Sequence, residues 1–505
     1  MQAAISPVRR DYDVIIVGAG VVGAMVARFL SRFDLDILWI EKEADICTGT
    51  TSANSAVIHG GYDAVPGSLK AELNVRGNAM WDRLAQELHF SFDRCGTYVV
   101  AVGAEERHAL EEQAARGRAN GVPVEIISGD EMRRREPLVT PETSGALTCS
   151  TGGVCDPWGA TIAAAENAVM NGVTLLRSTQ FEDFLWAQVE CSSKRTIAGV
   201  RTNQGDFGAR WVINAAGVYA DTLMHKAGSR PEFKITPRRG EYYVIDRNQF
   251  QMDSVLFPVP TKVSKGILVT TTVHGNTIVG PNAEEIEDRD DTAVTTAGMQ
   301  EIWDGARKLV PSLNQRAIIA VFAGLRPGSN APSPNPAVAY NKDFVVEIAP
   351  EVQGLINLAG IESPGLTAAP AIAERVIELL REAGELLSEK ASWDPVRPAR
   401  PVFRHLSRAE QADLVAREPG YGRVICRCEM VTEGEIVAEI HAPIPADTYD
   451  AIKRRTWLGT GRCQGAFDMP RVIEILAREL DRDPLTVSKK GSSSEFLTRK
   501  TKNAG

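Results

Sequence analysis

Apolar and polar positions near the N-terminus follow the order expected for a strand, a helix and a second strand. Residues 12–17 (YDVIIV) form a short apolar run bounded by turn residues, which predicts a buried strand. Residues 22–33 carry a helical apolar pattern, and residues 36–40 (DILWI) predict a second strand that leads into Glu41. The order strand–helix–strand predicts the start of a parallel sheet.

The pattern along the rest of the chain predicts a mixed fold. Helices are expected at 105–120, 161–172 and 368–380, and buried strands at 173–176, 211–216 and 354–359. Short strands at 242–245, 267–272 and 277–279, broken by Pro and Gly, fit an antiparallel sheet. We therefore expect an α/β part with a Rossmann-like sheet and an α+β part with an antiparallel sheet.

Composition and charge narrow the function classes. The chain has 505 residues, enough for several domains, and its net charge of −9 argues against nucleic acid as the main partner. No apolar run reaches ~18 uninterrupted residues, so we expect no transmembrane segment. Residues 1–10 lack the apolar core of a signal peptide, and eight cysteines are too few for a disulfide framework. These features predict a cytoplasmic protein.

A glycine motif joins the first predicted strand to its helix. Gly18, Gly20 and Gly23 form G-x-G-x-x-G: the first permits a tight turn, the second lets the backbone approach a pyrophosphate, and the third allows close helix–strand packing. Glu41, followed by Lys42, ends the second strand, where a carboxylate can accept from ribose hydroxyls. We find one such motif, and a single N-terminal site favours FAD over a flavin–NAD pair.

Several segments resemble one family of flavoenzymes. Residues 51–62 (TSANSAVIHGGY) are similar to the flavin-contacting segment of the D-amino-acid oxidase-like flavoenzymes, which include glycerol-3-phosphate and L-2-hydroxyglutarate dehydrogenases. Residues 66–70 (PGSLK) look especially like the latter. Further matching segments are RGEY at 239–242, FPVP at 257–260, GPN at 280–282, GLRP at 324–327 and SPGLT at 363–367. The resemblance covers about residues 11–382.

The C-terminal segment resembles the small [2Fe–2S] domain of bacterioferritin-associated ferredoxin type. The same pairing of domains occurs in the large subunit of anaerobic glycerol-3-phosphate dehydrogenase. The two resemblances imply a discontinuous FAD-binding domain (11–82, 150–225 and 320–382) and an antiparallel-sheet substrate domain (83–149 and 226–319). A proline-rich linker or surface strap (383–420), a small helical iron–sulfur domain (421–485) and a disordered Lys/Ser-rich tail (486–505) complete the expected organisation.

The flavoenzyme resemblance implies cofactor contacts beyond the glycine motif. The loop after the second strand would meet the pyrophosphate and the ring, and a helix N-terminus late in the chain would stabilise negative charge on the reduced ring. The residues implied are Thr51, Ser52, Ser55, Gly217, Gly365, Leu366 and Thr367. Each of these glycines, taken alone, also fits ordinary turn geometry.

Candidate substrate-binding and catalytic residues follow from the same segments. Arg326 is the leading candidate to bind an anionic substrate, because a guanidinium forks onto a carboxylate or phosphate; a structural ion pair is the alternative. His59 and His274 are candidates for the base that takes the alcohol proton, although a lone histidine is more often structural. Arg239 and Tyr242 would line the anion pocket, unless Arg239 and its neighbouring arginine form a solvated charge pair.

Three cysteines near the C-terminus match most of an iron–sulfur site. Cys426 and Cys428 form C-x-C, and Cys463 follows after 34 intervening residues. Asp468 stands where this domain type has its fourth cysteine, and a carboxylate is a harder ligand than a thiolate but can hold iron. The alternatives are a packing module that has lost its cluster and a zinc ion held by three cysteines and the aspartate.

Together these features predict an FAD-dependent dehydrogenase of a small anionic secondary alcohol, either a polyol phosphate like glycerol 3-phosphate or a 2-hydroxy acid. Hydride would pass to the flavin, and electrons would leave through the [2Fe–2S] centre to an acceptor protein or a quinone. Other subunits of a dehydrogenase complex, or a partner at the inner membrane, are compatible with that route. Two alternatives stay open: an amine, opine or imino-acid oxidase subunit, and an electron-transfer subunit of a larger flavoenzyme.

Overall fold

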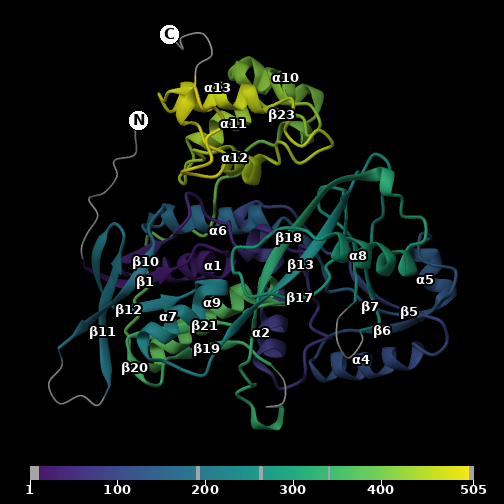
Figure 1. The fold of residues 1–505 in the computed structure, drawn as a ribbon, viewed down its shortest axis with the longest axis horizontal. Helices are drawn as coiled ribbons and strands as arrows, with labels where there is room; N and C mark the ends of the chain where they lie inside the picture. The colour runs from purple at the N-terminus through teal and green to yellow at the C-terminus, as the bar shows by residue number, and fades with distance from the viewer. Residues whose placement is uncertain (1–10, 189–193, 261–265, 339–341, 500–505) are drawn as a thin grey trace. The chain divides into compact units, whose positions relative to one another are not determined.

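The computed structural model (Figure 1) describes residues 11–188, 194–260, 266–338 and 342–499. The chain divides into two compact units. The first comprises Met1–Lys42 and Cys47–Pro395, and the second comprises Glu43–Ile46 and Val396–Gly505. Within the described ranges, we find no helix with both the length and the apolar character needed to span a bilayer.

A parallel sheet forms the centre of the first unit. β1 (Asp11–Val17) pairs with β2 (Ile37–Ile40) and β12 (Gly205–Asn214), β2 pairs with β9 (Thr174–Leu176), and β12 pairs with β21 (Leu355–Ala359). Every residue of β2 and β21 is buried, as a parallel sheet covered on both faces requires. The predicted strand–helix–strand start and the Rossmann-like sheet are confirmed.

Helices and a hairpin accompany the parallel sheet. α1 (Val21–Leu30) packs against α6 (Pro157–Met170) and α9 (Gly365–Glu382), and α9 packs against α2 (Leu69–Asn78). α7 (Ala220–Ala227) contributes Leu223 to a core shared with Ile15 and Leu38 of the sheet. The hairpin of β10 (Phe181–Ala187) and β11 (Arg195–Thr202) pairs antiparallel with β12. The helices predicted at 161–172 and 368–380 correspond to α6 and α9.

A second, largely antiparallel sheet also belongs to the first unit, and its longest pair joins β13 (Ile235–Ile245) to β18 (Ile318–Ser329) (Figure 1). Its other strands are β16 (Thr277–Val279), β15 (Val269–Thr271), β14 (Val255–Pro258), β5 (Thr97–Val102), β7 (Thr143–Cys149), β6 (Glu125–Ser128) and β17 (Glu284–Glu285). α8 (Thr296–Leu309) buries Ile302 and Ala306 in the core of this layer. The predicted antiparallel sheet is confirmed, although β14 pairs with β5 in parallel.

Shorter elements fill the remainder of the first unit. They are β3 (Val57–Ile58), α3 (Trp81–Leu88), β4 (Phe92–Asp93), α4 (Arg107–Ala119), α5 (Gly129–Arg135), β8 (Gly153–Cys155), β19 (Val345–Ile348) and β20 (Val352–Gln353). α4 corresponds to the helix predicted at 105–120. The small β3–β8–β4 sheet holds the segment that leads into His59.

Residues 383–395 form a strap over the first unit. The N–H of Lys390 donates to Arg32 O (2.8 Å), and Asn167 Nδ2 donates to Asp394 O (3.0 Å). We predicted a linker over the whole of 383–420. Beyond this strap the prediction is wrong, because α10 (Arg408–Arg417) folds within the second unit. Its N-terminus is closed by a capping box, which supplies the backbone hydrogen bonds that a loop would lack.

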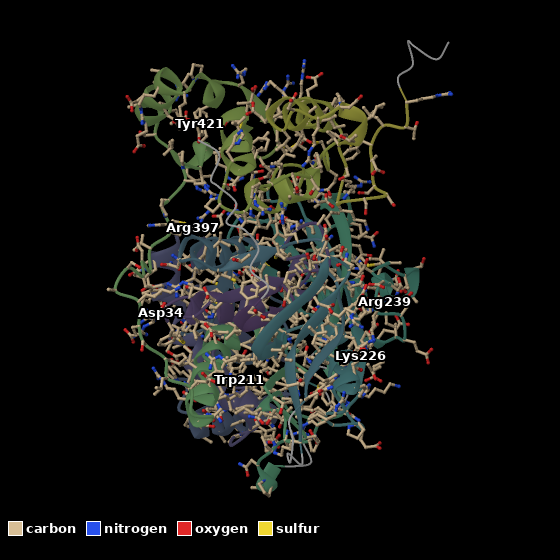
Figure 2. The ribbon with its side chains drawn as sticks, turned by 90° about the vertical axis from the view of Figure 1, so that its left-hand side faces the viewer. Asp34, Trp211, Lys226, Arg239, Arg397 and Tyr421 are labelled. Atoms are coloured by element: carbon tan, nitrogen blue, oxygen red, sulfur yellow. The ribbon has the colours of Figure 1, made fainter. Side chains whose placement is uncertain are left out.

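The second unit is a small helical module. β22 (Val424–Cys426) pairs with β23 (Val431–Thr432), and α11 (Glu433–Ile440), α12 (Tyr449–Thr456) and α13 (Met469–Glu479) share a core that includes Ile436, Ile452 and Leu476. A smaller cluster joins Leu414 of α10 to Phe403 and Tyr421 (Figure 2). The predicted helical character of this domain is therefore confirmed.

The tail expected to be disordered is ordered as far as residue 499. Ser488 and Glu495 form an isolated bridge, and the Phe496 ring packs edge-on against Tyr449 with centroids 5.6 Å apart. Val487 is buried in the same core, so two apolar anchors hold a segment whose overall composition is polar. Residues 500–505 of the expected tail lie outside the described residues.

Candidate active site

The glycine motif makes a tight turn between β1 and α1. Gly18 has φ of +104°, a region that favours glycine, and a Cβ there would lie 2.5 Å from the carbonyl oxygen of Ala215. A Cβ at Gly23 would lie 2.0 Å from the carbonyl oxygen of Gly18. Gly20 is the N-cap of α1, and the hydroxyl of Thr51 meets the N–H of the first helical residue, Val21. A helix N-terminus at the carboxyl end of a central parallel strand is suited to a pyrophosphate.

Glu41 and Thr51 both meet this turn. Glu41 Oε2 accepts from the N–H of Ala19 at 2.7 Å, and Thr51 Oγ1 accepts from the N–H of Val21 at 3.0 Å. Lys42 Nζ lies 4.4 Å from the centre of the Tyr219 ring. The structure therefore gathers these residues at the carboxyl ends of β1 and β2.

Gly217 follows β12, which neighbours β1. Its φ is +57°, and a Cβ built on it would meet nothing within 4 Å among the described residues. The glycine is therefore required by backbone conformation and leaves open space beside the turn.

The loop that contains Ser52 and Ser55 lies against β18. Thr50 Oγ1 donates to the carbonyl oxygen of Leu325 at 2.6 Å, and a Cβ on Gly324 would lie 2.2 Å from the carbonyl oxygen of Ala53. Ser52 Oγ donates within its own loop, to Gly49 O at 2.8 Å. Ser55 lies beside Tyr242, so this loop reaches the antiparallel sheet as well as the glycine turn.

Tyr242 and Arg326 lie on one face of the β13–β18 pair, whereas Arg239 lies on the other. Opposed residues of an antiparallel pair share a face, and the register places Tyr242 opposite Phe322 and Arg238 opposite Arg326. The Tyr242 and Phe322 rings stack with centroids 4.6 Å apart. Arg239, one position along the strand, therefore points to the opposite face.

Arg239, which Figure 2 labels, forms ion pairs with two carboxylates on that opposite face. Its guanidinium pairs with Glu284 at 2.6 Å and with Asp291 at 2.8 Å, and the side chain is 6% exposed. Pairing with these acids raises the pKa of Arg239, Glu284 contributing most. The structure thus contradicts the expectation that Arg239 lines the anion pocket: it forms a structural ion-pair cluster, because strand alternation turns it away from Tyr242.

Arg326 is a partly buried cation held by neutral groups. Nη2 donates to the carbonyl oxygen of Asn282 at 2.7 Å and to that of Arg239 at 3.3 Å. Burial lowers the pKa of the Arg326 guanidinium, and the nearby Tyr242 and Glu362 act in the opposite direction. No ion pair joins Arg326 to a carboxylate of the described residues. This cation is therefore available to an anionic ligand.

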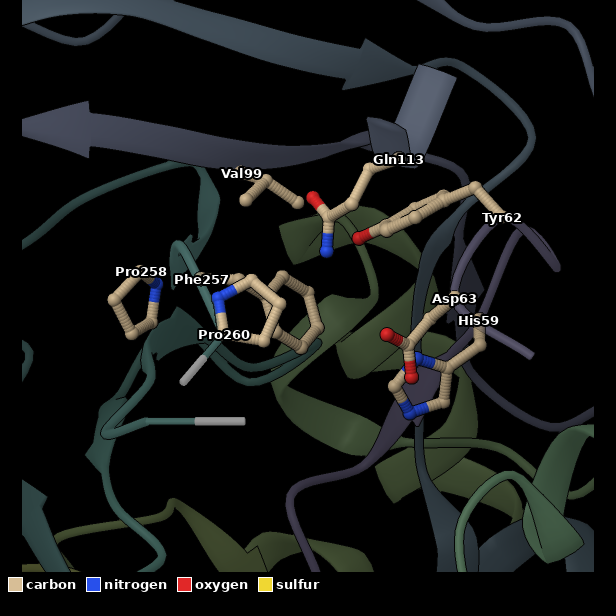
Figure 3. Close-up of a pocket in the computed structure, with 8 residues that line it drawn as sticks. All are labelled: His59, Tyr62, Asp63, Val99, Gln113, Phe257, Pro258 and Pro260. Atoms are coloured by element: carbon tan, nitrogen blue, oxygen red, sulfur yellow. The ribbon is translucent and has the colours of Figure 1, made fainter. Parts of the chain in front are cut away.

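His59 lines a pocket of about 280 Å³ that is open to solvent (Figure 3). The other lining residues are Tyr62, Asp63, Val99, Gln113, Phe257, Pro258 and Pro260. The backbone of His59 is fixed on both sides: its N–H donates to Thr367 Oγ1 at 2.9 Å, and its carbonyl oxygen accepts from Asn78 Nδ2 at 2.9 Å. Nε2 lies 3.2 Å from Ser363 Oγ. His59 is thus a held imidazole at a pocket wall, as a general base requires.

His274 is placed differently. Its side chain is 7% exposed, and Nε2 lies 3.7 Å from Asp156 Oδ2. Asp156 is the N-cap of α6 and accepts from the N–H groups of Trp158 and Gly159. His274 is therefore packed against a helix cap, which favours a structural role over the catalytic one.

The N-terminus of α9 reaches both candidate groups. Pro364 is its N-cap and provides no side-chain hydrogen bond. Just before it, Ser363 contacts His59, and Glu362 acts electrostatically on Arg326. Gly365 and Thr367 are buried at the start of the helix. Ser363 therefore brings the base candidate to this helix end, and Glu362 lies within electrostatic reach of the anion-binding candidate.

In the second unit, Cys426 and Cys428 pack in the core that α13 shares, and Asp468 is the N-cap of α13. Cys426 and Asp468 are each 1% exposed. Tyr449 Oη donates to Asp468 Oδ1 at 2.7 Å, whereas Asp468 Oδ2 is buried with no hydrogen-bond partner in the described structure. Among the described residues, no three His, Cys, Asp or Glu side chains surround a single-ion site, which gives the zinc alternative no support. A [2Fe–2S] cluster binds its four protein ligands at two different irons. Three thiols and one unsatisfied carboxylate oxygen fit such a cluster.

Sequence reasoning missed the hydrogen bonds that orient these groups. Ser363 stands 304 residues from its partner His59, and Tyr449 stands 19 residues from Asp468. Gln113 lines the pocket from α4, a helix with no recognisable motif, whereas Tyr62 lines it from the end of the segment 51–62. His59 and Ser363 each lie in a segment that resembles the flavoenzymes. This shared resemblance is the sequence signal that could have indicated that the two residues lie close together.

Comparison with known proteins supports a flavoenzyme part followed by an iron–sulfur domain. Residues 13–379 match the FAD dependent oxidoreductase family, and residues 424–478 match the BFD-like [2Fe-2S] binding domain. The chain is 42% identical over 494 residues to glycerol 3-phosphate dehydrogenase of Caloramator mitchellensis, covering 97% of this chain and 99% of that one. It is 28% identical over 404 residues to the mitochondrial L-2-hydroxyglutarate dehydrogenase of Arabidopsis thaliana, covering 72% and 82% of the two chains.

A solved structure shares the fold of the first unit. The dithionite-reduced L-α-glycerophosphate oxidase of Mycoplasma pneumoniae with FAD bound has a TM-score of 0.70 and is 31% identical, covering 78% of this chain and 100% of that chain. The resemblance to D-amino-acid oxidase-like flavoenzymes is therefore confirmed, and so are the expected cofactor FAD and the [2Fe–2S] type of the C-terminal domain. The chain belongs to the FAD-dependent oxidoreductases, with a BFD-like [2Fe–2S] binding domain appended.

Proposed function

We propose that this enzyme is a dehydrogenase of a small anionic secondary alcohol, with glycerol 3-phosphate the first candidate and a 2-hydroxy acid the second. The observation that carries the proposal is Arg326, whose guanidinium is bonded to backbone carbonyls and which lies on the same face of β13–β18 as Tyr242. A partly buried cation that forms no ion pair within the described residues is costly, and an anionic substrate group would offset that cost. Relatives named for glycerol 3-phosphate and for L-2-hydroxyglutarate support this substrate class.

The residues of the site suggest how the alcohol is handled. FAD, when bound, supplies the acceptor for the hydride that leaves the alcohol carbon. Arg326 would hold the phosphate or carboxylate of the substrate, with Tyr242 beside it. His59 would take the hydroxyl proton, and Ser363 Oγ, 3.2 Å from Nε2, would fix the orientation of the imidazole. Phe257, whose ring centroid lies 5.7 Å from that of His59, would keep the pocket wall apolar.

For the cofactor, the glycine turn and the N-terminus of α9 would hold the two ends of FAD. The residues assigned to it are Gly18, Gly20, Gly23, Glu41, Lys42, Thr51, Ser52, Ser55, Gly217, Gly365, Leu366 and Thr367. With these residues, the FAD-binding domain would consist of 11–82, 150–225 and 320–382, and the substrate domain of 83–149 and 226–319. Electrons would leave through the [2Fe–2S] centre to an acceptor protein, another subunit or a quinone.

A panel of substrates tests the proposed function. Under anaerobic conditions, glycerol 3-phosphate or L-2-hydroxyglutarate should bleach the flavin absorbance, whereas glycerol, which lacks the anionic group, should bleach it far more slowly. Secondary amines of opine or imino-acid type serve as the matched alternative class. Rapid bleaching by an amine and none by either alcohol would contradict the proposal.

The glycine turn predicts a sharp effect on cofactor binding. A Cβ at Gly23 would meet backbone atoms at 2.0 Å, so Gly23→Ala must displace the turn or the helix, and we expect about tenfold or greater loss of bound FAD. The flavin-to-protein absorbance ratio of purified protein, followed by FAD titration, measures this loss. Gly49→Ala is the matched control, because its φ is −83° and nothing lies within 4 Å of its Cβ position in the described structure. Equal FAD content in both variants would contradict the assignment.

A further inference from the structure

Asp468 presents an unsatisfied carboxylate oxygen inside the second unit. As the N-cap of α13, it would ordinarily accept a backbone N–H of the first helical turn, but it makes no such bond. Its carboxylate is turned inward, where Oδ1 accepts from Tyr449 Oη at 2.7 Å and Oδ2 meets no donor among the described residues. Burying a carboxylate oxygen without a partner is costly, so this oxygen has the environment of a metal ligand.

The four predicted ligand side chains form two pairs. Cys426 lies beside Asp468, and Cys428 lies beside Cys463. A [2Fe–2S] cluster takes two protein ligands at each iron, so two pairs are the arrangement that such a cluster needs. The pairing also indicates which ligands would share an iron.

Glycines hold the loop against these ligands. A Cβ on Gly461 would lie 2.5 Å from Cys428 Cβ, and a Cβ on Gly459 or Gly465 would lie 2.5 or 2.3 Å from Tyr449 Oη. The backbone therefore approaches Cys428 and Tyr449 too closely for any larger residue. This approach holds the hydroxyl of Tyr449, which donates to Asp468 Oδ1, while Oδ2 meets no donor within the described residues.

We propose that Asp468 is the fourth ligand of the [2Fe–2S] centre, binding through Oδ2 the same iron as Cys426, while Cys428 and Cys463 bind the other iron. Tyr449 is a positioning residue: by occupying Oδ1 it keeps the carboxylate monodentate and lowers its basicity. A carboxylate donates less electron density than a thiolate, so the centre should have a higher reduction potential than one with four cysteines. The proposal does not depend on which alcohol is oxidised.

Full-length protein, reconstituted anaerobically with iron and sulfide and reduced with dithionite, provides the test. Bound iron, the EPR g-values of the reduced cluster and its reduction potential are measured for each variant. Asp468→Asn, which keeps the size of the side chain and its bond to Tyr449, and Asp468→Ala should each retain about tenfold less iron under a chelator challenge. Asp468→Cys should retain two irons, with changed g-values and a lower potential. The exposed Asp413→Asn, on α10, should match the wild type.

Tyr449→Phe tests the positioning role separately. It should retain the cluster but lower its potential, because Asp468 loses a hydrogen bond and becomes a stronger donor. Iron content and g-values in Asp468→Asn equal to those of the wild type would overturn the ligand assignment. A wild type that binds no cluster while Asp468→Cys binds one would also overturn it, and an unchanged potential in Tyr449→Phe would overturn the role of the tyrosine. Since dithionite is the reductant, all these outcomes are independent of the proposed substrate.

Discussion

Replacing Arg326 with alanine should raise the KM for glycerol 3-phosphate by about 30-fold to several thousand-fold, the equivalent of ~2–5 kcal/mol for one lost partner of a buried charge pair. The reason is that the Arg326 guanidinium is held by backbone carbonyls and is not paired with a carboxylate of the described residues. The KM for glycerol, which has no anionic group, should change little. Steady-state kinetics on both alcohols with an artificial electron acceptor measures the difference.

Arg239→Gln is the matched control for that experiment. Arg239 lies one strand position away, on the opposite face, and is paired with Glu284 and Asp291. Its loss should lower thermal stability while leaving the KM for glycerol 3-phosphate within a few-fold of the wild type. Equal KM increases for both alcohols in Arg326→Ala, or a large increase in Arg239→Gln, would contradict the anchoring role of Arg326.

Replacing His59 with asparagine should lower kcat by about 10²- to 10⁴-fold, the usual contribution of a positioned general base. Asparagine can still contact Ser363 but cannot accept the alcohol proton. The acidic limb of the pH–rate profile, where a protonated imidazole cannot act as a base, should disappear in the variant. Anaerobic stopped-flow measurement of flavin reduction over a range of pH tests both expectations.

His274→Asn distinguishes His59 from the second histidine candidate. His274 packs beside Asp156 at the N-cap of α6, so its loss should affect stability more than turnover. We expect kcat within a few-fold of the wild type and an intact acidic limb. If His274→Asn lost as much rate as His59→Asn, the assignment of His59 as the base would be contradicted.

Local patterns in the sequence were sufficient to predict the elements that hold the cofactor. The apolar run at 12–17 and the glycines at 18, 20 and 23 specify a strand, a turn and a helix without help from distant residues, and β1 and α1 form there. The antiparallel sheet was predicted from short strands for the same reason. Candidate groups that follow directly from such elements, such as Glu41 at the end of β2, were found with them.

Features that depend on long-range pairing could not be predicted in this way. Arg239 and Arg326 look equivalent in sequence, and only the register of β13 against β18 places them on opposite faces. The tail was expected to be disordered from its composition, yet Phe496 packs against Tyr449. In both cases the deciding partner lies far along the chain, where local periodicity carries no information.

We expect electrons to enter at the flavin from an anionic alcohol and to leave through a [2Fe–2S] centre completed by Asp468. The most direct test mixes full-length protein anaerobically with glycerol 3-phosphate and follows flavin absorbance together with freeze-quenched EPR. We predict that the flavin bleaches and that a reduced-cluster signal then appears without dithionite, whereas Asp468→Asn keeps the bleaching and loses the signal. A bleached flavin beside a cluster that stays oxidised and EPR-silent in the wild type would contradict the account.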